Sequence, residues 1–155
     1  MIIQLKKGRD GPSTLACVRP DGSRTWAHLH PFFPVHDLTH CAVESVLQIG
    51  QAFFGLVRSG WAIDDFASPG TAHRLPAEAV RAERIVGVFD LERASGRAYT
   101  AAEFNAAAPG GAAITEADLA AIRSLRDELH ARWIALAPGQ TLEIPFPVIP
   151  LTPAR

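Results

Sequence analysis

Strand-like and helix-like patterns occupy separate parts of this sequence, and that separation limits the folds open to it. Three short segments rich in apolar and β-branched residues, 2–7, 14–19 and 25–30, precede the helical periodicity, and a fourth, 141–146, follows it. The second and third are joined by Pro-Asp-Gly-Ser at 20–23, where proline presets φ and glycine accepts a positive φ. Strands and helices segregated in this way are typical of an α+β fold.

Apolar residues recur at helical spacing through the middle of the chain. We predict a helix over 35–59, a second over 76–94, a short one over 100–107, and a last one from Thr115 to just before Pro138. We therefore expect a small antiparallel sheet, made of the three N-terminal strands and the C-terminal strand, packed against three main helices. No repeat or long linker divides the chain, so residues 1–155 are predicted to form a single domain.

Composition excludes several classes of partner. The net charge is −1, and no cluster of lysine and arginine occurs, so we expect neither a nucleic-acid partner nor a membrane-surface role. The sequence has no secretory signal pattern and no apolar run long enough to span a bilayer, which predicts a cytoplasmic protein. Cys17 and Cys41 are then expected to be reduced thiols. A homodimer remains an open alternative.

The segment His36-Asp37-Leu38-Thr39-His40 carries the clearest chemical signal. Histidines four apart on a helix project the same way, with Cβ atoms about 5–6 Å apart, so both imidazoles can reach one metal ion. The acid after the first histidine resembles the glutamate of the His-Glu-x-x-His zinc helix, where it acts as general base. The pattern predicts a divalent metal site, with zinc as the first choice and Asp37 as the catalytic acid–base residue. The preceding Phe32-Phe33 pair is placed at a pocket mouth beside the histidines.

The third ligand is expected from another element. With a rise of 1.5 Å per residue, Glu44 lies about 9 Å along the helix from a metal between the histidines, so it fits a supporting partner of His40 better than a ligand. Glu83 or Asp90 on the second helix is the first choice, with Gly87 between them to allow close approach. His30 comes next, as a ligand or supporting residue. The remaining candidates are His28, His73, His130, Asp64 and Asp65.

These residues also fit a structural interpretation. A histidine pair at this spacing arises by chance, and a partly buried histidine often only bonds a backbone carbonyl. Two hypotheses therefore stand side by side. The first is a metal-dependent hydrolase acting on a small molecule of unknown identity. The second is a non-catalytic module that binds a small molecule or a partner and has a structural histidine cluster.

Two resemblances bear on this segment. Pro-Phe-Phe-Pro-Val-His-Asp-Leu-Thr-His-Cys-Ala-Val-Glu at 31–44, followed by Ala-Phe-Phe-Gly-Leu-Val at 52–57 and Gly-Trp at 60–61, resembles a family of uncharacterised small bacterial proteins. It covers roughly residues 26–66 and implies no established activity. His-Asp-x-x-His also resembles the metal-binding helix of a ubiquinone-biosynthesis scaffold family. That pattern has a glutamate twelve residues after the second histidine, where this chain has Ala52, so only His36, Asp37 and His40 carry over.

Overall fold

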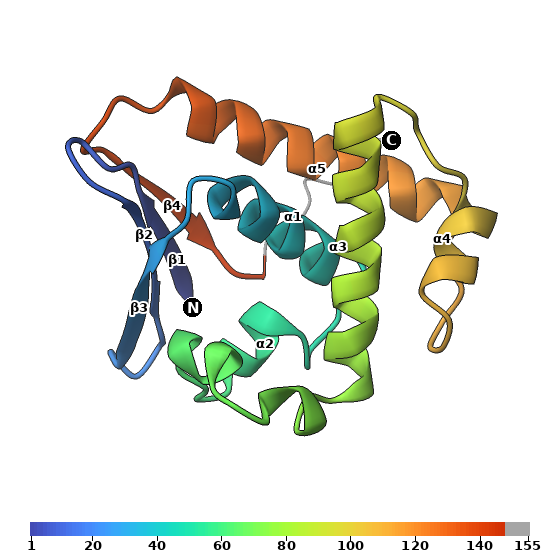
Figure 1. The fold of residues 1–155 in the computed structure, drawn as a ribbon, viewed down its shortest axis with the longest axis horizontal. Helices are drawn as coiled ribbons and strands as arrows, with labels where there is room; N and C mark the ends of the chain where they lie inside the picture. The colour runs from blue at the N-terminus through green and yellow to red at the C-terminus, as the bar shows by residue number, and fades with distance from the viewer. Residues whose placement is uncertain (148–155) are drawn as a thin grey trace.

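The computed structural model describes residues 1–147, so part of the predicted single domain, 148–155, lies outside the described residues. Its sheet has four antiparallel strands in the order β3-β2-β1-β4 (Figure 1). The strands are β1 (Ile2–Lys6), β2 (Ser13–Val18), β3 (Arg24–Leu29) and β4 (Thr141–Pro145). The α+β class and the predicted make-up of the sheet are confirmed.

The sheet buries one face because apolar residues alternate along its central strands. The buried side chains of β1 stand opposite buried side chains of both neighbours: Ile3 opposite Cys17 and Ile144, and Leu5 opposite Leu15 and Leu142. These residues join one hydrophobic cluster with the buried sides of the helices.

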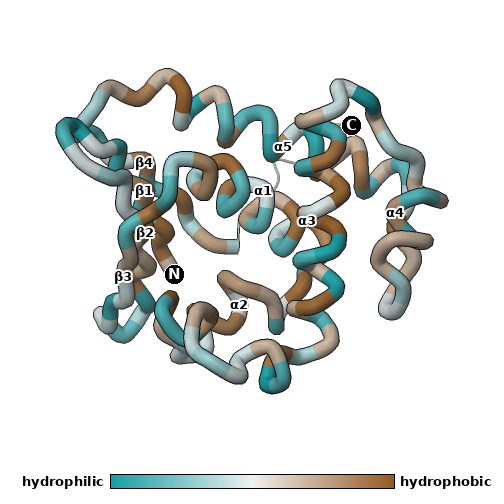
Figure 2. The backbone as a smooth tube through the Cα atoms, viewed as in Figure 1, coloured by the Kyte–Doolittle hydropathy of each residue, from teal (hydrophilic) through white to brown (hydrophobic). Residues whose placement is uncertain are grey.

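Within residues 1–147 the sheet is accompanied by five α-helices: α1 (Phe33–Val46), α2 (Phe53–Arg58), α3 (Ala77–Ser95), α4 (Ala101–Ala107) and α5 (Glu116–Ala135). Two short 3-10 turns lie between α2 and α3, at Ile63–Ala67 and Thr71–His73. Thr100 and Thr115 close capping boxes at the starts of α4 and α5, as their sequences predict. Figure 2 shows apolar and polar segments alternating along α3, as expected of a helix with one buried side.

Helix α1 is the central helix and is buried nearly all round. It packs against α2, α3 and α5, with α5 crossing on one side and α2 on the other in Figure 1. Every residue from Asp37 to Ser45 is buried. A helical projection of the sequence puts Asp37, Cys41 and Ser45 on the polar face of this helix, yet all three are buried.

The predicted continuous helix 35–59 is also wrong, because it is two helices. Helix α1 ends at Val46, Gln48 takes a positive φ of 52°, and α2 begins at Phe53. The Glu44 side chain accepts hydrogen bonds from the backbone N–H groups of Phe54 (3.1 Å) and Gly55 (3.0 Å), so it caps the helix that follows its own. The chain has to fold back to bring those groups to Glu44, which a straight helix cannot do.

Glycine at position 55 is required by this turn. A Cβ atom there would lie 2.2 Å from the carbonyl oxygen of Gly50, which is backbone and cannot rotate away. We expect Gly55→Ala to lower the free energy of unfolding by about 2 kcal/mol, as overpacking does.

Gly87→Ala is the matched control. A Cβ at Gly87 would meet nothing within 4 Å, so the predicted close helix approach at Gly87 is wrong, and we expect alanine to stabilise α3 by about 0.5–1 kcal/mol. Urea denaturation measures the change in the free energy of unfolding of each variant, and equal changes in the two would contradict the prediction.

The structure also shows the surroundings of the two cysteines and the character of the helices. Cys17 and Cys41 are free and buried, and burial raises the pKa of each thiol to about 12. Both side chains therefore act as small apolar core residues. Within residues 1–147, every helix is too short or too polar to cross a membrane. A cytoplasmic location stays a prediction.

Candidate metal centre

His36, His40 and Glu83 come together where α1 packs against α3. One ligand atom from each residue lies within 4.8 Å of the other two. The two imidazole rings share one side of α1 because they are four residues apart, and their centroids are 4.9 Å apart. Glu83, one of the two acids of the second helix predicted as third ligand, comes from α3. The group runs outward from buried His40 through half-buried His36 to Glu83, whose side chain is 52% exposed.

Each histidine has a carboxylate beside its Nδ1 atom. His36 Nδ1 lies 2.8 Å from Asp90 Oδ2, and His40 Nδ1 lies 3.4 Å from Glu44 Oε1. On its other side, His40 Nε2 lies 3.2 Å from Glu83 Oε1. Carboxylates in this position fix the orientation and tautomer of metal-binding histidines. Since Asp90 occupies Nδ1 of His36, the Nε2 atom of that ring is the nitrogen left to bind a cation.

Two buried polar atoms, one in the group and one on the preceding turn of α1, have no hydrogen-bond partner among the described residues. They are Asp37 Oδ2 and His40 Nδ1, whose 3.4 Å separation from Glu44 does not satisfy hydrogen-bond geometry. Orphaned buried atoms are rare in folded proteins, and a bound water molecule or ion is one explanation for them. Two imidazoles and one carboxylate also match the donor set of catalytic zinc sites. The residues present therefore fit a divalent cation.

The protonation of the group is set by burial and by its own charges. Burial disfavours the charged form of His40, but the carboxylates of Glu44 and Glu83 outweigh it and raise the pKa of His40 to about 10. Burial opposes the charge on Glu83 too, yet the hydrogen bond and charge of His40 lower the pKa of Glu83. Burial, with the Glu83 charge added, raises the pKa of Asp37 to about 7, although the charge of His40 lowers it. A cation bound here would replace the proton on His40, since a ligating imidazole is neutral.

The other predicted candidates are not part of the group formed by His36, His40 and Glu83 in residues 1–147. His30 stacks on Phe32, and the exposed Phe33 ring contacts both His30 and His36, while a pocket mouth at this pair stays a prediction. Asp90 supports His36. The rest have other contacts or lie elsewhere: His28 beside Trp26, His130 bonded to the Val35 carbonyl, Asp65 bonded to Ala62 N, and Asp64 and His73 in the 3-10 turns.

Sequence reasoning missed two supporting features. Glu44 caps α2 besides facing His40, and the signal that could have shown this is Gly50, which interrupts the helical pattern six residues later. Phe53 packs its ring 6.0 Å from the His40 ring, a contact made possible only by the turn between α1 and α2.

Comparison with known proteins adds no family. A scan against family models, a search of curated proteins and a search of solved structures each found no match. The two sequence resemblances therefore stay predictions, and the function of this chain is inferred from the site itself.

Proposed function

We propose that His36, His40 and Glu83 bind one divalent cation, with zinc as the first choice, and that the protein is a metal-dependent hydrolase. The observation that carries the proposal is the approach of the three ligand atoms to within 4.8 Å of one another. Two histidines and one glutamate are the protein ligands of several catalytic zinc sites, which leave a fourth position open. The exposure of Glu83 supports an opening to solvent on that side.

The neighbouring residues have distinct parts in this proposal. A bound cation would act as a Lewis acid and lower the pKa of a water molecule toward about 7. Asp90 bonds Nδ1 of His36, and the Glu44 carboxylate faces Nδ1 of His40 at 3.4 Å, so the opposite nitrogen of each ring is the one assigned to the ion. Asp37 is assigned the catalytic role of orienting the attacking water or accepting a proton at Oδ2, the buried oxygen that has no partner among residues 1–147.

A second candidate is favoured by a specific observation. The cluster already pairs its own charges, because His36 contacts Asp90 and His40 contacts Glu83 and Glu44. The rings of Phe32 and Phe33 are also exposed at the start of α1. Self-paired histidines beside exposed aromatic rings fit a non-catalytic module that binds a partner or small molecule. In that case the histidines stabilise the fold, and His36→Ala/His40→Ala would destabilise it.

Metal content tests the proposal. We expect protein purified without an affinity tag to carry about one equivalent of divalent metal by elemental analysis, as a three-ligand site predicts. The His36→Ala/His40→Ala variant is expected to lose it, while the control variant His28→Ala/His73→Ala, which removes two exposed histidines, keeps it. Equal metal content in the two variants, or no uptake by wild type after incubation with zinc, would overturn the proposal.

Asp90→Asn tests whether the Asp90 carboxylate helps His36 to bind the metal ion. The amide keeps the shape of the side chain but loses the charge that faces Nδ1, so we expect zinc affinity to fall by about 10–100-fold with the fold unchanged. Asp64→Asn, which neutralises an exposed acid outside the site, is the matched control. Competition with a chelating dye measures both affinities, and an unchanged affinity in Asp90→Asn would show that Asp90 does not support a ligand.

A further inference from the structure

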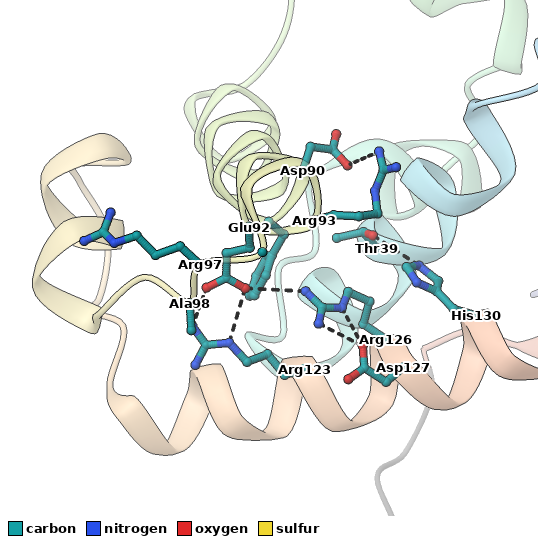
Figure 3. Close-up of a pocket in the computed structure, with 12 residues that line it drawn as sticks. Thr39, Asp90, Glu92, Arg93, Arg97, Ala98, Arg123, Arg126, Asp127 and His130 are labelled. Atoms are coloured by element: carbon teal, nitrogen blue, oxygen red, sulfur yellow. Dashed lines mark hydrogen bonds and ion pairs between the residues drawn. The ribbon is translucent and has the colours of Figure 1, made fainter.

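A second site candidate lies next to the metal centre. A cavity of about 350 Å³ opens between α3, α5 and the loop after α3, with Thr39 of α1 on its wall (Figure 3). We call it the arginine pocket, because four arginines and three carboxylates line it: Arg93, Arg97, Arg123 and Arg126, with Asp90, Glu92 and Asp127. Its volume lies in the range of small-molecule sites, which is about 300–1,000 Å³.

The carboxylates of the pocket are already engaged. Glu92 accepts hydrogen bonds from Arg123 and from the backbone N–H of Tyr99, and pairs with Arg126 at 3.5 Å. Asp127 pairs with Arg126 at 2.8 Å. These contacts form a closed network on the α5 side, so neither acid is free to neutralise a further cation. Arg97 pairs with Glu103 of α4 and points away from the other arginines in Figure 3.

Arg93 lies outside this network and has few hydrogen-bond partners for its guanidinium group. Its one polar contact within residues 1–147 is Nη2 to Asp90 Oδ1, at 3.4 Å, and its side chain is 49% exposed. Asp90 gives its other oxygen to His36, so it serves two positive partners at once. A guanidinium group has five N–H donors in a planar fork that matches a carboxylate or phosphate, and most of the Arg93 donors face no acceptor among these residues.

We infer that the arginine pocket binds a small anion, the phosphate or carboxylate group of the molecule on which the metal centre acts, and that Arg93 is its main donor. Asp90 joins the two sites, since it contacts Arg93 through Oδ1 and His36 through Oδ2. An anion held by Arg93 is therefore one side chain away from a proposed metal ligand. The link to a substrate rests on the proposed hydrolase function, whereas anion binding itself does not.

Calorimetric titration of metal-free protein with inorganic phosphate, and separately with malonate, tests the inference at constant ionic strength with EDTA present. We expect saturable binding of at least one of these probes, and the tighter one identifies the class of anion. Arg93→Gln is expected to weaken that binding at least tenfold. Arg93→Lys keeps the charge without the planar fork, so an intermediate loss is expected. It also provides a readout if Arg93→Gln fails to fold.

Arg84→Gln is the matched control, because it removes the same charge from an exposed residue of the same helix outside the pocket. Its affinity should stay within twofold of wild type. No saturable binding of either probe, or equal losses in Arg93→Gln and Arg84→Gln, would overturn the inference. Because the titrations are made without metal, they test the pocket alone, and the metal content of the wild-type protein tests the proposed function separately.

Discussion

Glu44→Gln is expected to lower the free energy of unfolding by about 3 kcal/mol, which is typical of removing one partner from a buried charged contact. Glu44 is 1% exposed, and its two oxygens accept the N–H groups of Phe54 and Gly55 while one of them faces His40. Glutamine keeps the size of the side chain but offers one acceptor oxygen, and its amide hydrogens oppose an N–H donor. The first turn of α2 then loses part of its cap.

Glu78→Gln is the control for this substitution. Glu78 also accepts a backbone N–H, that of Gln51 at 3.1 Å, but the contact is exposed and water can replace it. We expect Glu78→Gln to change stability by less than about 0.5 kcal/mol. Urea denaturation of both variants gives the comparison. Equal losses would show that Glu44 matters only as a negative charge near α2 and does not act as a buried cap.

The contacts of Glu44 also belong to the part of the fold that could not be predicted from the sequence. The strands were predictable because each is a short apolar run bounded by turn residues, and α3, α4 and α5 begin near Pro76, Thr100 and Thr115 as their capping patterns indicate. The end of α1 after Val46 was not predictable, because a helical projection assumes one continuous helix. Only the folded chain shows that a side chain of α1 caps α2, an interaction across ten residues that no periodicity encodes.

Part of the candidate site was likewise predictable from the sequence, and part of it was not. Spacing along one helix predicted that His36 and His40 share a side, and the position of Glu83 beside the apolar stripe of the second helix made it a candidate ligand. Choosing between Glu83 and Asp90 needed the relative placement of α1 and α3, which depends on side-chain packing along both helices. The arginine pocket could not be predicted, since its residues come from several elements and form no motif.

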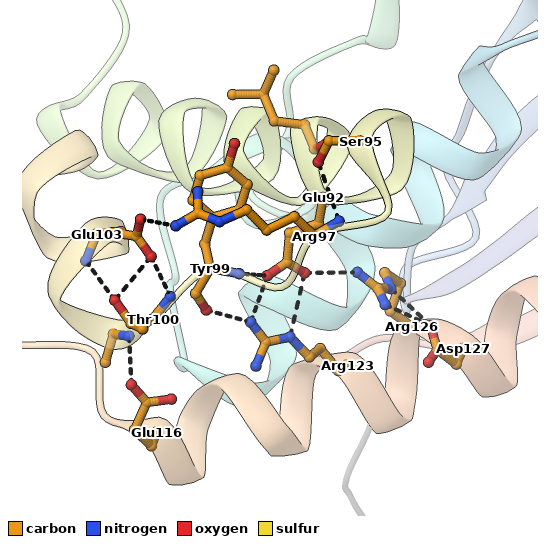
Figure 4. Close-up of polar contacts among 12 residues, drawn as sticks. Glu92, Ser95, Arg97, Tyr99, Thr100, Glu103, Glu116, Arg123, Arg126 and Asp127 are labelled. Carbon is orange, nitrogen blue, oxygen red and sulfur yellow. Dashed lines mark hydrogen bonds and ion pairs between the residues drawn. The ribbon is translucent and has the colours of Figure 1, made fainter.

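The second large effect is expected at Glu92, the centre of the ion network in Figure 4. Glu92 is 7% exposed and contacts Arg123, Arg126 and the backbone N–H of Tyr99, so it links α3 to α5 and to the loop before α4. Glu92→Gln leaves two partly buried guanidinium groups facing a neutral side chain. We expect it to lower the free energy of unfolding by about 3 kcal/mol, in the range for breaking a buried ion pair. Glu128→Gln, which affects an exposed pair with Arg132 at 3.8 Å, should cost less than about 0.5 kcal/mol.

The pH dependence of this difference provides a separate check. Burial raises the pKa of Glu92, but the bonds from Arg123 and Tyr99 outweigh it, so the pKa in the folded protein lies below its ordinary value of 4.5. A carboxylate with a lowered pKa stabilises the folded state fully above the unfolded pKa and loses that contribution as pH falls. The gap between wild type and Glu92→Gln should therefore be constant near neutral pH and shrink below about pH 4.5. Urea denaturation of both proteins at a series of pH values measures the gap, and a gap that stays constant into acid would mean that packing around the side chain, rather than its charge, holds α3 to α5.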